Sequence, residues 1–431
     1  MMEIASLYQL FIQYPTVTTD TRNIPANSIF FALKGERFNG NVFAAEALSK
    51  GAAYAVIDQP EYATSDRMIL VDDVLLCLQQ LASYHRSQLK LPILAITGTN
   101  GKTTTKELIA AVLAKKYRIH YTQGNLNNHI GVPLTLLAMT PETEMGIVEM
   151  GANHPGEIKM LCEIADPDYG MVTNMGKAHL EGFGSFEGVI KTKSEMYDYL
   201  RVKKAKCFIN ADNPLLLKQA AHLEQITYGK TEGCFLTGEL ATTEYNLVIR
   251  ALFPKGWLYL KSKLIGNYNF ENLLAAACIG KYFEVDPLQI QKALDEYTPS
   301  NNRSQLIRSP KNTIIMDAYN ANPTSMMMAL SNFVSIDNDQ KCIILGDMLE
   351  LGEVSEAEHQ KIVDYIEANH FPEVILVGPR FKMTTTTNKK KKFDTVELLF
   401  DHLQNYPLQN KLILVKGSRG IHLEKILELL T

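Results

Sequence analysis

The chain has 431 residues, more than one hydrophobic core usually holds, so we expect two or three domains. Hydrophobic residues make up 46% and charged residues 21%, as in soluble globular proteins, and the formal net charge of -4 gives no basic field for nucleic acid. The start, MMEIASLYQLFIQYP, lacks the features of a signal peptide, and no apolar run is long enough to span a membrane, so we expect a cytoplasmic protein. Six cysteines are scattered without a C-x-x-C pair, which argues against a zinc site or disulfide framework and favours small core residues.

Residues 1–85 mix short apolar runs with helical patterns. The runs SIFFALKG and AAYAVID predict strands, and the segments Phe43–Lys50 and Val74–His85 predict helices. We interpret this stretch as a small α/β domain.

Residues 86–300 begin with a strand signal after Pro92. The apolar run Ile93–Ile96 ends in a glycine-rich turn, and Lys102–Lys116 follows with the spacing of a helix. Further strands are predicted at Gly146–Met150 and Gly170–Asn174. Strands that alternate with helices indicate a mostly parallel sheet.

Residues 301–431 repeat this alternation, which predicts a third, Rossmann-like α/β domain. Helices are predicted after Pro323, which suits a first helical position, after Ser355, which forms a capping box with Glu358, and at Leu423–Leu430. The run Lys389–Lys392 follows four threonines and is interpreted as a solvated loop. The predicted strands are Thr313–Asp317, Cys342–Gly346, Val374–Gly378 and Leu412–Lys416.

The segment TGTNGKTTT, residues 97–105, lies between a predicted strand and a predicted helix. Its glycines let backbone N–H groups approach a phosphate, and the helix N-terminus adds its positive dipole end. Lys102 would neutralise the β- and γ-phosphates, and the Thr103 hydroxyl would bind Mg²⁺. Ile96 stands where the longer P-loop pattern has glycine, so this is the shorter variant G-x-x-G-K-T. The alternative is a glycine-rich turn that arose by chance.

Three further residues are candidates whose local sequence also allows a structural reading. Glu149 ends an apolar run, where a carboxylate could face a phosphate-bound Mg²⁺ or lie on the surface. His179 alone is more often a structural histidine than a ligand, and Lys193, on a predicted helix, is by itself more often solvated.

The segments GTNGKTTT, VEMGANHPGEI, TNMGKAHLEGFGS and KTKSEM together resemble the Mur ligase family, in its order and approximate spacing. The resemblance implies that Thr103 and Glu149 hold one Mg²⁺, and that His179 and an N-carboxylated (carbamylated) Lys193 hold or position a second. A carbamate supplies anionic oxygens that an ammonium group lacks. Lys191 is the alternative site of that modification.

The resemblance also implies the nucleotide contacts. In GNYNFENLLAAA, Asn269 and Asn272 should lie near the adenine, Arg303 should reach the γ-phosphate, and Asp317 should contact the ribose. Each position alone also suits a cap or a turn. The expected ATP-binding set is Gly98, Thr99, Asn100, Gly101, Lys102, Thr103, Thr104, Asn269, Arg303 and Asp317.

The ends of the chain resemble particular members of the family. DTRNIPANSIFFALKGERFNG resembles a UDP-binding domain, and GNLNNHIGVPLTLL, DAYNANPTSM, LGDMLELGEVSEAEH and VKGSRG resemble the enzyme that joins D-alanyl-D-alanine to a UDP-muramoyl tripeptide. The resemblance therefore implies an ATP-dependent ligase that acts through an acyl phosphate, and a monomer. The expected substrate residues are Arg22, Lys34, Asn128, Asn320, Asn322, Lys416 and Arg419.

The sequence departs from the family pattern at two places, and three alternative functions remain. Asn39-Gly40-Asn41 stands for Asp-Gly-His, and His422 stands where Met-Arg is more usual. Turn-capping asparagines and surface bases would also account for the substrate candidates of the third domain. The alternative functions are a sister ligase that adds a single amino acid, a P-loop NTPase switch, and an inactive nucleotide-binding module.

Overall fold

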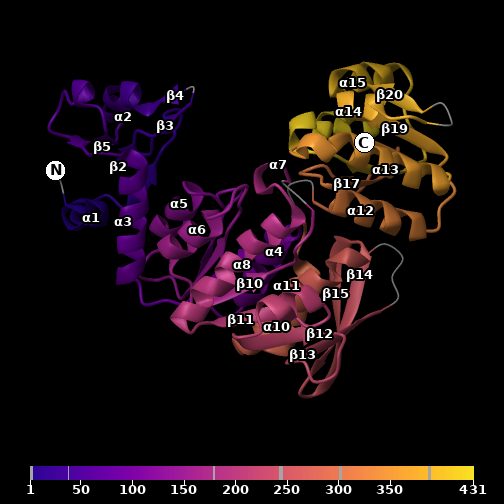
Figure 1. The fold of residues 1–431 in the computed structure, drawn as a ribbon, viewed down its shortest axis with the longest axis horizontal. Coiled ribbons are helices and arrows are strands. Elements are labelled where there is room, and N and C mark those ends of the chain that lie inside the picture. The colour runs from indigo at the N-terminus through magenta and orange to yellow at the C-terminus, as the bar shows by residue number, and fades with distance from the viewer. Residues whose placement is uncertain (1–2, 37, 178–179, 242–245, 300–302, 387–389) are drawn as a thin grey trace.

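The computed structural model describes residues 3–36, 38–177, 180–241, 246–299, 303–386 and 390–431. Three α/β units follow one another along the long axis of the molecule, with the N-terminal and C-terminal units at opposite ends (Figure 1). The three-unit α/β fold expected from the sequence is confirmed. Among the described helices, none has the length and apolar character needed to cross a membrane.

The N-terminal unit is a four-stranded parallel sheet in the order β1-β2-β5-β6. The buried residues Phe30, Ala44 and Ala55 belong to the core on one side of this sheet. Its strands are β1 (Thr16–Thr18), β2 (Ser28–Phe31), β5 (Tyr54–Ile57) and β6 (Met68–Leu70), with a hairpin of β3 (Lys34–Gly35) and β4 (Phe38–Asn39). Its helices are α1 (Ile4–Gln13), η1 (Gly40–Phe43), α2 (Ala44–Ser49), η2 (Pro60–Tyr62) and α3 (Val74–Gln88).

Helix α3 joins this unit to the next. Arg86, near its end, donates to the carbonyls of Ala165 and Asp166 and pairs with the Asp168 carboxylate at 2.8 Å. The side chain of Arg86 is almost fully buried, so its donors are satisfied inside the protein.

The middle unit is a nine-stranded sheet in the order β15-β14-β13-β12-β11-β10-β7-β9-β8. It is parallel from β8 to β13, and β14 and β15 add antiparallel strands at one edge. Its strands are β7 (Ile93–Thr97), β8 (Ile119–Tyr121), β9 (Met145–Glu149), β10 (Tyr169–Val172), β11 (Lys206–Asn210), β12 (Glu224–Gly229), β13 (Leu236–Leu240), β14 (Asn246–Phe253) and β15 (Gly256–Ile265). Its helices are α4 (Lys102–Leu113), α5 (Gly131–Leu137), α6 (Glu157–Ala165), α7 (Leu180–Phe183), α8 (Phe186–Lys203), α9 (Pro214–Gln219), η3 (Asn267–Asn269), α10 (Phe270–Tyr282) and α11 (Pro287–Glu296).

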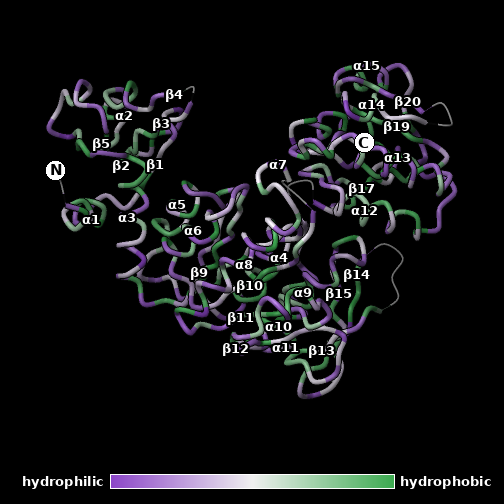
Figure 2. The backbone as a smooth tube through the Cα atoms, in the orientation of Figure 1, coloured by the Kyte–Doolittle hydropathy of each residue, from purple (hydrophilic) through white to green (hydrophobic). Residues whose placement is uncertain are grey.

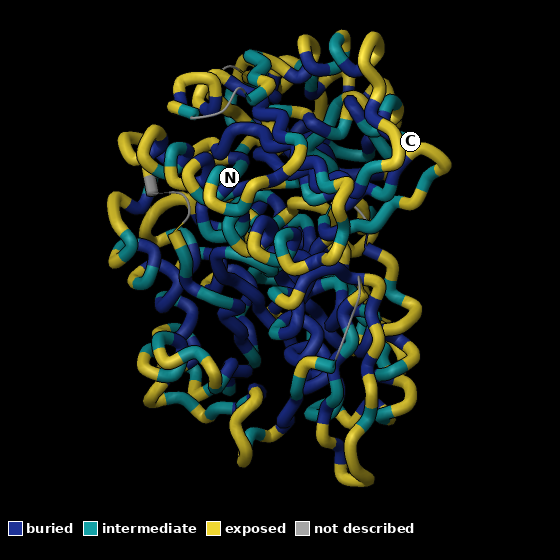
Figure 3. Tube along the Cα trace, turned by 90° about the vertical axis from the view of Figure 1, so that its right-hand side faces the viewer, coloured by how far each residue is buried: buried dark blue, intermediate teal, exposed yellow. Residues whose placement is uncertain are grey.

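Helices cover both faces of this sheet. One core forms where α3, α5, α6 and α8 meet the sheet, and a second forms under α4, α10 and α11. All five residues of β7 are buried because the strand lies between these two layers. Figure 2 shows mainly hydrophobic strands inside more hydrophilic loops, and Figure 3 shows the buried segments at the centre.

The C-terminal unit is a six-stranded sheet in the order β16-β17-β21-β18-β19-β20, parallel except for the edge strand β16. Hydrophobic cores cover both of its faces. Its strands are β16 (Gln305–Arg308), β17 (Thr313–Asp317), β18 (Lys341–Gly346), β19 (Glu373–Val377), β20 (Lys391–Phe393) and β21 (Leu412–Lys416). Its helices are α12 (Pro323–Ser335), η4 (Gly352–Val354), α13 (Ser355–Ala368), α14 (Pro379–Met383), α15 (Val396–Asn405), η5 (Arg419–Ile421), η6 (Leu423–Ile426) and α16 (Leu427–Leu430).

Most predicted strands are confirmed to within two residues, but three local predictions are wrong. Ser355 is the first residue of α13 and not its cap, because the short helix η4 runs directly into α13. The helix predicted over Leu423–Leu430 begins as 3₁₀ turns, and α4 ends at Leu113 and not at Lys116.

The lysine run was expected to be a solvated loop, and this is only partly correct. Lys391 and Lys392 begin the edge strand β20, where Lys392 donates to the Thr384 hydroxyl at 3.1 Å and Lys391 pairs with Glu373. Lys389 lies outside the described residues. Five of the six cysteines are buried, as expected of small core residues.

Candidate functional site

The predicted phosphate loop lies between β7 and α4, as the sequence indicates. Gly98 and Gly101 have φ of +140° and +78°, and a Cβ at Gly98 would overlap the Thr173 side chain, so only glycine fits there. The Asn100 N–H donates to Asn174 Oδ1 at 3.0 Å, and the Thr173 hydroxyl donates to the Asn100 carbonyl at 2.6 Å. The end of β10 therefore holds the loop in place before any ligand binds.

Lys102 is the first residue of α4, at the helix end that attracts anions. Its Nζ donates to the carbonyls of Gly98 at 2.7 Å and Thr99 at 3.2 Å, so the side chain folds back onto the loop. Burial lowers the pKa of Lys102, while nearby Glu149 opposes this shift. A phosphate bound here would place a negative charge beside the buried Lys102 ammonium group and so stabilise its charged form.

The loop faces a cavity of about 550 Å³ between the middle and C-terminal units. One wall is the phosphate loop with segments that follow β8 and β9, and the opposite wall comes from the C-terminal unit. Of the predicted residues, those on its wall are Thr99, Asn100, Gly101, Lys102, Thr103, Thr104, Asn128, Glu149, Asn269, Asn272, Arg303, Asp317, Asn320, Asn322, Lys416 and Arg419.

Glu149 ends β9 on this wall, almost fully buried. Its Oε1 accepts from the Thr103 hydroxyl at 3.1 Å and from Asn127 Nδ2 at 2.8 Å. Its Oε2 is buried and has no hydrogen-bond partner among the described residues. A carboxylate oxygen that accepts no hydrogen bond, beside a threonine hydroxyl on a phosphate loop, fits a hard cation such as Mg²⁺.

Lys106, which the sequence reading missed, lies behind Glu149. Its ammonium group is 3.7 Å from Glu149 Oε2 and donates to the Thr122 carbonyl at 2.7 Å. A signal was available in the spacing, because Lys102 and Lys106 are four residues apart and share one face of α4. The Lys106 side chain is fully buried and is therefore not a solvated surface lysine.

Lys193 lies on α8, as predicted, and its side chain is nearly fully buried, with Nζ 5.7 Å from the centre of the Phe183 ring. Burial, with a contribution from the charge of Lys102, lowers its pKa to about 7. Lys191, the alternative, is exposed. Lys193 is not among the residues that line the cavity, so the structure does not join it directly to Thr103 and Glu149. His179 lies outside the described residues.

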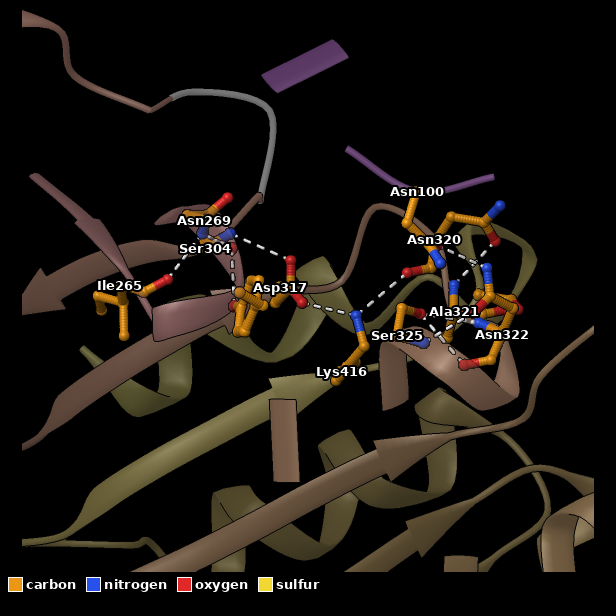
Figure 4. Close-up of polar contacts among 12 residues, drawn as sticks. Asn100, Ile265, Asn269, Ser304, Asp317, Asn320, Ala321, Asn322, Ser325 and Lys416 are labelled. Atoms are coloured by element: carbon orange, nitrogen blue, oxygen red, sulfur yellow. Dashed lines mark hydrogen bonds and ion pairs between the residues drawn. The ribbon is translucent and has the colours of Figure 1, made fainter. Parts of the chain in front are cut away.

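The C-terminal wall is a set of linked polar side chains (Figure 4). Asp317, at the end of β17, pairs with Lys416 at 2.6 Å and accepts from the Ser304 N–H at 3.1 Å. Asn322 caps α12 with Ser325 in a capping box, and its Nδ2 donates to Asn100 Oδ1 at 2.8 Å. This last contact joins the C-terminal unit directly to the phosphate loop.

Arg303 and Arg419 both contact Tyr319, a second residue that the sequence reading missed. The Arg303 guanidinium carbon is 3.6 Å from the centre of the Tyr319 ring, and its Nε is buried without a hydrogen-bond partner among the described residues. Arg419 Nη1 donates to the Tyr319 hydroxyl at 3.4 Å. Tyr319 sits in DAYNANP, but nothing in that motif alone indicates an arginine contact.

The two asparagines expected near the adenine are held by internal hydrogen bonds. Asn269 Nδ2 donates to the Ile265 carbonyl at 2.8 Å (Figure 4). Asn272 Nδ2 donates to Asn269 Oδ1 at 2.8 Å. Asn272 Oδ1 accepts from the Thr105 hydroxyl at 3.0 Å. Both residues reach the cavity, and these bonds fix their orientation.

The three other substrate candidates are divided between two places. Asn128 lines the cavity, and its Oδ1 accepts from the N–H groups of Ile130 and Gly131 at the start of α5. Lys34 pairs with the buried carboxylate of Asp58 at 3.0 Å, and Arg22 forms an exposed pair with Asp20. Lys34 and Arg22 therefore lie in the N-terminal unit, apart from the phosphate loop.

Three family models match the chain. They are described as "Mur ligase family, catalytic domain" over residues 13–86, "Mur ligase middle domain" over residues 96–280, and "Mur ligase, glutamate ligase domain" over residues 302–419. Together they follow the three units of the structure.

Several relatives are similar over almost the whole chain. A Bacillus subtilis protein named "UDP-N-acetylmuramoyl-tripeptide--D-alanyl-D-alanine ligase" is 35% identical, covering 96% of this chain and 92% of its own length. The Escherichia coli protein of the same name is 32% identical, with 97% and 94% covered.

Solved structures of MurF ligases are also similar to this chain over nearly its whole length. MurF from Acinetobacter baumannii has a TM-score of 0.84 and 30% identity, with 96% of this chain and 92% of that chain covered. MurF ligase from Thermotoga maritima, solved in complex with ADP, has a TM-score of 0.85 and 26% identity, with 100% and 98% covered.

Proposed function

The chain belongs to the Mur ligase family, and we propose that it joins D-alanyl-D-alanine to UDP-N-acetylmuramoyl-tripeptide at the expense of ATP. The product would be the pentapeptide precursor of peptidoglycan. The observation that carries this proposal is the cavity in which a phosphate loop, Glu149 and Arg303 face one another across two units. The near full-length similarity to ligases of that name supports the choice of substrates. We further propose that the protein acts as a monomer.

Each of the three units would bind a different substrate. Residues 1–85 would bind the UDP group with Arg22 and Lys34, residues 86–300 would bind ATP, and residues 301–431 would close the cavity and bind the dipeptide. Asn128, Asn320, Asn322, Lys416 and Arg419 would line the path of the peptide substrates. All five are on the cavity wall.

The first chemical step would form an acyl phosphate. ATP lies with its phosphates on residues 98–104, where backbone N–H groups and the dipole of α4 stabilise their charge. The tripeptide carboxylate attacks the γ-phosphorus, the bond to the β–γ bridging oxygen breaks, and ADP leaves. Lys102 and Arg303 reduce the repulsion between the two anions as they approach.

The second step would form the peptide bond. The neutral amine of D-alanyl-D-alanine attacks the acyl carbon, loses a proton, and inorganic phosphate leaves. Water competes with the amine for the acyl phosphate, so a closed cavity between the units is needed during this step.

Thr103 and Glu149 would hold Mg²⁺, which screens phosphate charge when it is bound. Glu149 Oε2, which accepts no hydrogen bond from the described residues, supports this assignment. We propose that a carbamylated Lys193 and His179 serve a second Mg²⁺. Burial and the lowered pKa of Lys193 support the modification, because a carbamate forms only from the neutral amine. Asn269 and Asn272 would contact the adenine, and Asp317 the ribose.

The test is ADP release by the wild-type protein with UDP-N-acetylmuramoyl-tripeptide, with and without D-alanyl-D-alanine. The ligase should need both substrates and Mg²⁺. Full ADP release with ATP alone would instead identify an NTPase switch. A single D-amino acid or diaminopimelate as the preferred acceptor would identify a sister ligase.

A further inference from the structure

Three segments that are distant in the sequence meet at one aromatic ring on the cavity wall. Arg303 precedes β16, Tyr319 follows β17, and Arg419 begins η5 after β21. The guanidinium carbons of Arg303 and Arg419 lie 3.6 Å and 5.3 Å from the centre of the Tyr319 ring. All three side chains line the cavity.

The Tyr319 ring stabilises two nearby guanidinium groups whose positive charges repel each other. An aromatic face attracts a guanidinium group through its quadrupole, and the attraction is stronger where water is excluded. Tyr319 provides this face to Arg303, and its hydroxyl accepts a hydrogen bond from Arg419. Arg303 therefore contacts the ring closely, whereas Arg419 lies farther from the ring and also binds the hydroxyl.

Among the ion pairs of the described residues, none joins Arg303 to a carboxylate. Asp317, an acidic residue on the same cavity wall, pairs with Lys416 and accepts a hydrogen bond from the Ser304 N–H. The Nε of Arg303 is buried with no hydrogen-bond partner among the described residues. Stacking on Tyr319 is thus the contact that fixes the direction of this guanidinium group.

We propose that Tyr319 is a positioning residue that orients both arginines toward anions in the cavity. Arg303 is held toward the transferring phosphoryl group, and Arg419 toward the carboxylate of the acceptor dipeptide. This inference rests on the proposed function and adds to it a residue that links the two substrate sites. The ring supplies orientation, and the arginines supply the charge.

Two substitutions test the contributions of the Tyr319 ring and of its hydroxyl separately. Tyr319→Phe keeps the face that stacks on Arg303 and removes the acceptor for Arg419, so the KM for D-alanyl-D-alanine should rise about threefold with a smaller effect on kcat. Tyr319→Leu removes both contacts, and kcat should fall about 10- to 30-fold, in line with a buried cation–π contact. Tyr319 lies on the cavity wall and not in a core, so both variants should fold. Tyr406→Leu, at an exposed tyrosine, is the matched control and should change neither constant.

The deciding measurement is a double-substitution cycle with Arg303→Ala. If Tyr319 acts through Arg303, Tyr319→Leu should cost little further kcat once Arg303 is gone. An equal loss in both backgrounds, or a Tyr319→Phe variant as slow as Tyr319→Leu, would overturn the proposal. Thermal unfolding of each variant separates a folding defect from lost positioning.

The wild-type assay distinguishes a failure of the proposed function from a failure of the role proposed for Tyr319. If wild-type ADP release does not depend on D-alanyl-D-alanine, the proposed function fails whatever the variants do. If it does depend on the dipeptide and the cycle shows no coupling, only the role of Tyr319 fails.

Discussion

The carboxylate of Glu149 lies 3.7 Å from the ammonium group of Lys106, and both side chains are almost fully buried. A buried charge that loses its partner costs about 3–5 kcal/mol, because the remaining ion stays desolvated. The pair therefore keeps an acidic group inside the middle unit when no cation is bound to it.

Lys106→Met should lower the thermal midpoint of unfolding by about 10 °C, since 1 kcal/mol corresponds to roughly 2–4 °C in a unit of this size. The variant leaves Glu149 without a counter-charge. The double variant Lys106→Met with Glu149→Gln should regain more than half of the loss, because no buried charge then remains unpaired. A double variant no more stable than the single one would show that Lys106 stabilises the fold by packing alone.

Lys102→Ala should reduce kcat by about 100-fold or more, because it removes a cation aimed at the transferring phosphoryl group. The thermal midpoint should change little, since Lys102 contacts loop carbonyls and not a core. Steady-state ADP release measures the effect. Lys115→Ala, just beyond the same helix, is the control, and near-normal turnover by Lys102→Ala would exclude this loop as the ATP site.

Lys193→Ala should lose most activity yet still bind ATP, and a small carboxylic acid should restore part of the rate by replacing the carbamate oxygens. Lys193→Arg should not be rescued, because its guanidinium group fills the space with positive charge. Lys191→Ala should behave like wild type, since that side chain is exposed. Mass spectrometry without acid should show an added carboxyl group on Lys193. Wild-type activity of Lys193→Ala at low CO₂ would rule the modification out.

His85 should make the protein less stable as the pH falls from 7 to 5. Its Nε2 donates to the Met139 carbonyl at 2.9 Å and its Nδ1 lies 3.2 Å from the Tyr8 hydroxyl, an arrangement that suits the neutral ring, and burial lowers its pKa. Below the unfolded value of about 6.5, the unfolded chain binds a proton that the folded chain excludes, so stability present above that pH is lost as it falls.

The variant His85→Phe isolates this contribution. It should be less stable at pH 7, where it leaves the Met139 carbonyl unpaired, but its thermal midpoint should fall less between pH 7 and pH 5. Exposed His154, replaced in the same way, is the control. Parallel pH profiles for His85→Phe and wild type would contradict the assignment.

The order of strands and helices around the phosphate loop could be predicted from the sequence, because buried parallel strands are short continuous apolar runs. Glu149 and Thr103 were likewise placed by their positions at a strand end and a helix start. Lys106 and Tyr319 were not predicted, because their roles depend on contacts with Thr122 and Arg303, which lie on other segments. The antiparallel strands β14 and β15 were not predicted either, although buried and exposed residues alternate along β14 as expected of a strand with one exposed face.

The hydrogen bonds that join the C-terminal unit to the middle unit include Asn322 to Asn100 and the Asn267 N–H to Asn332 Oδ1. These groups are uncharged, and each such bond contributes only about 0.5–1.5 kcal/mol net. Dissolved salt screens charges and leaves contacts of this kind nearly unchanged. These two contacts should therefore hold the units together equally well at low and at high salt, whereas interactions of the arginines in the cavity with bound phosphates should weaken as salt is added.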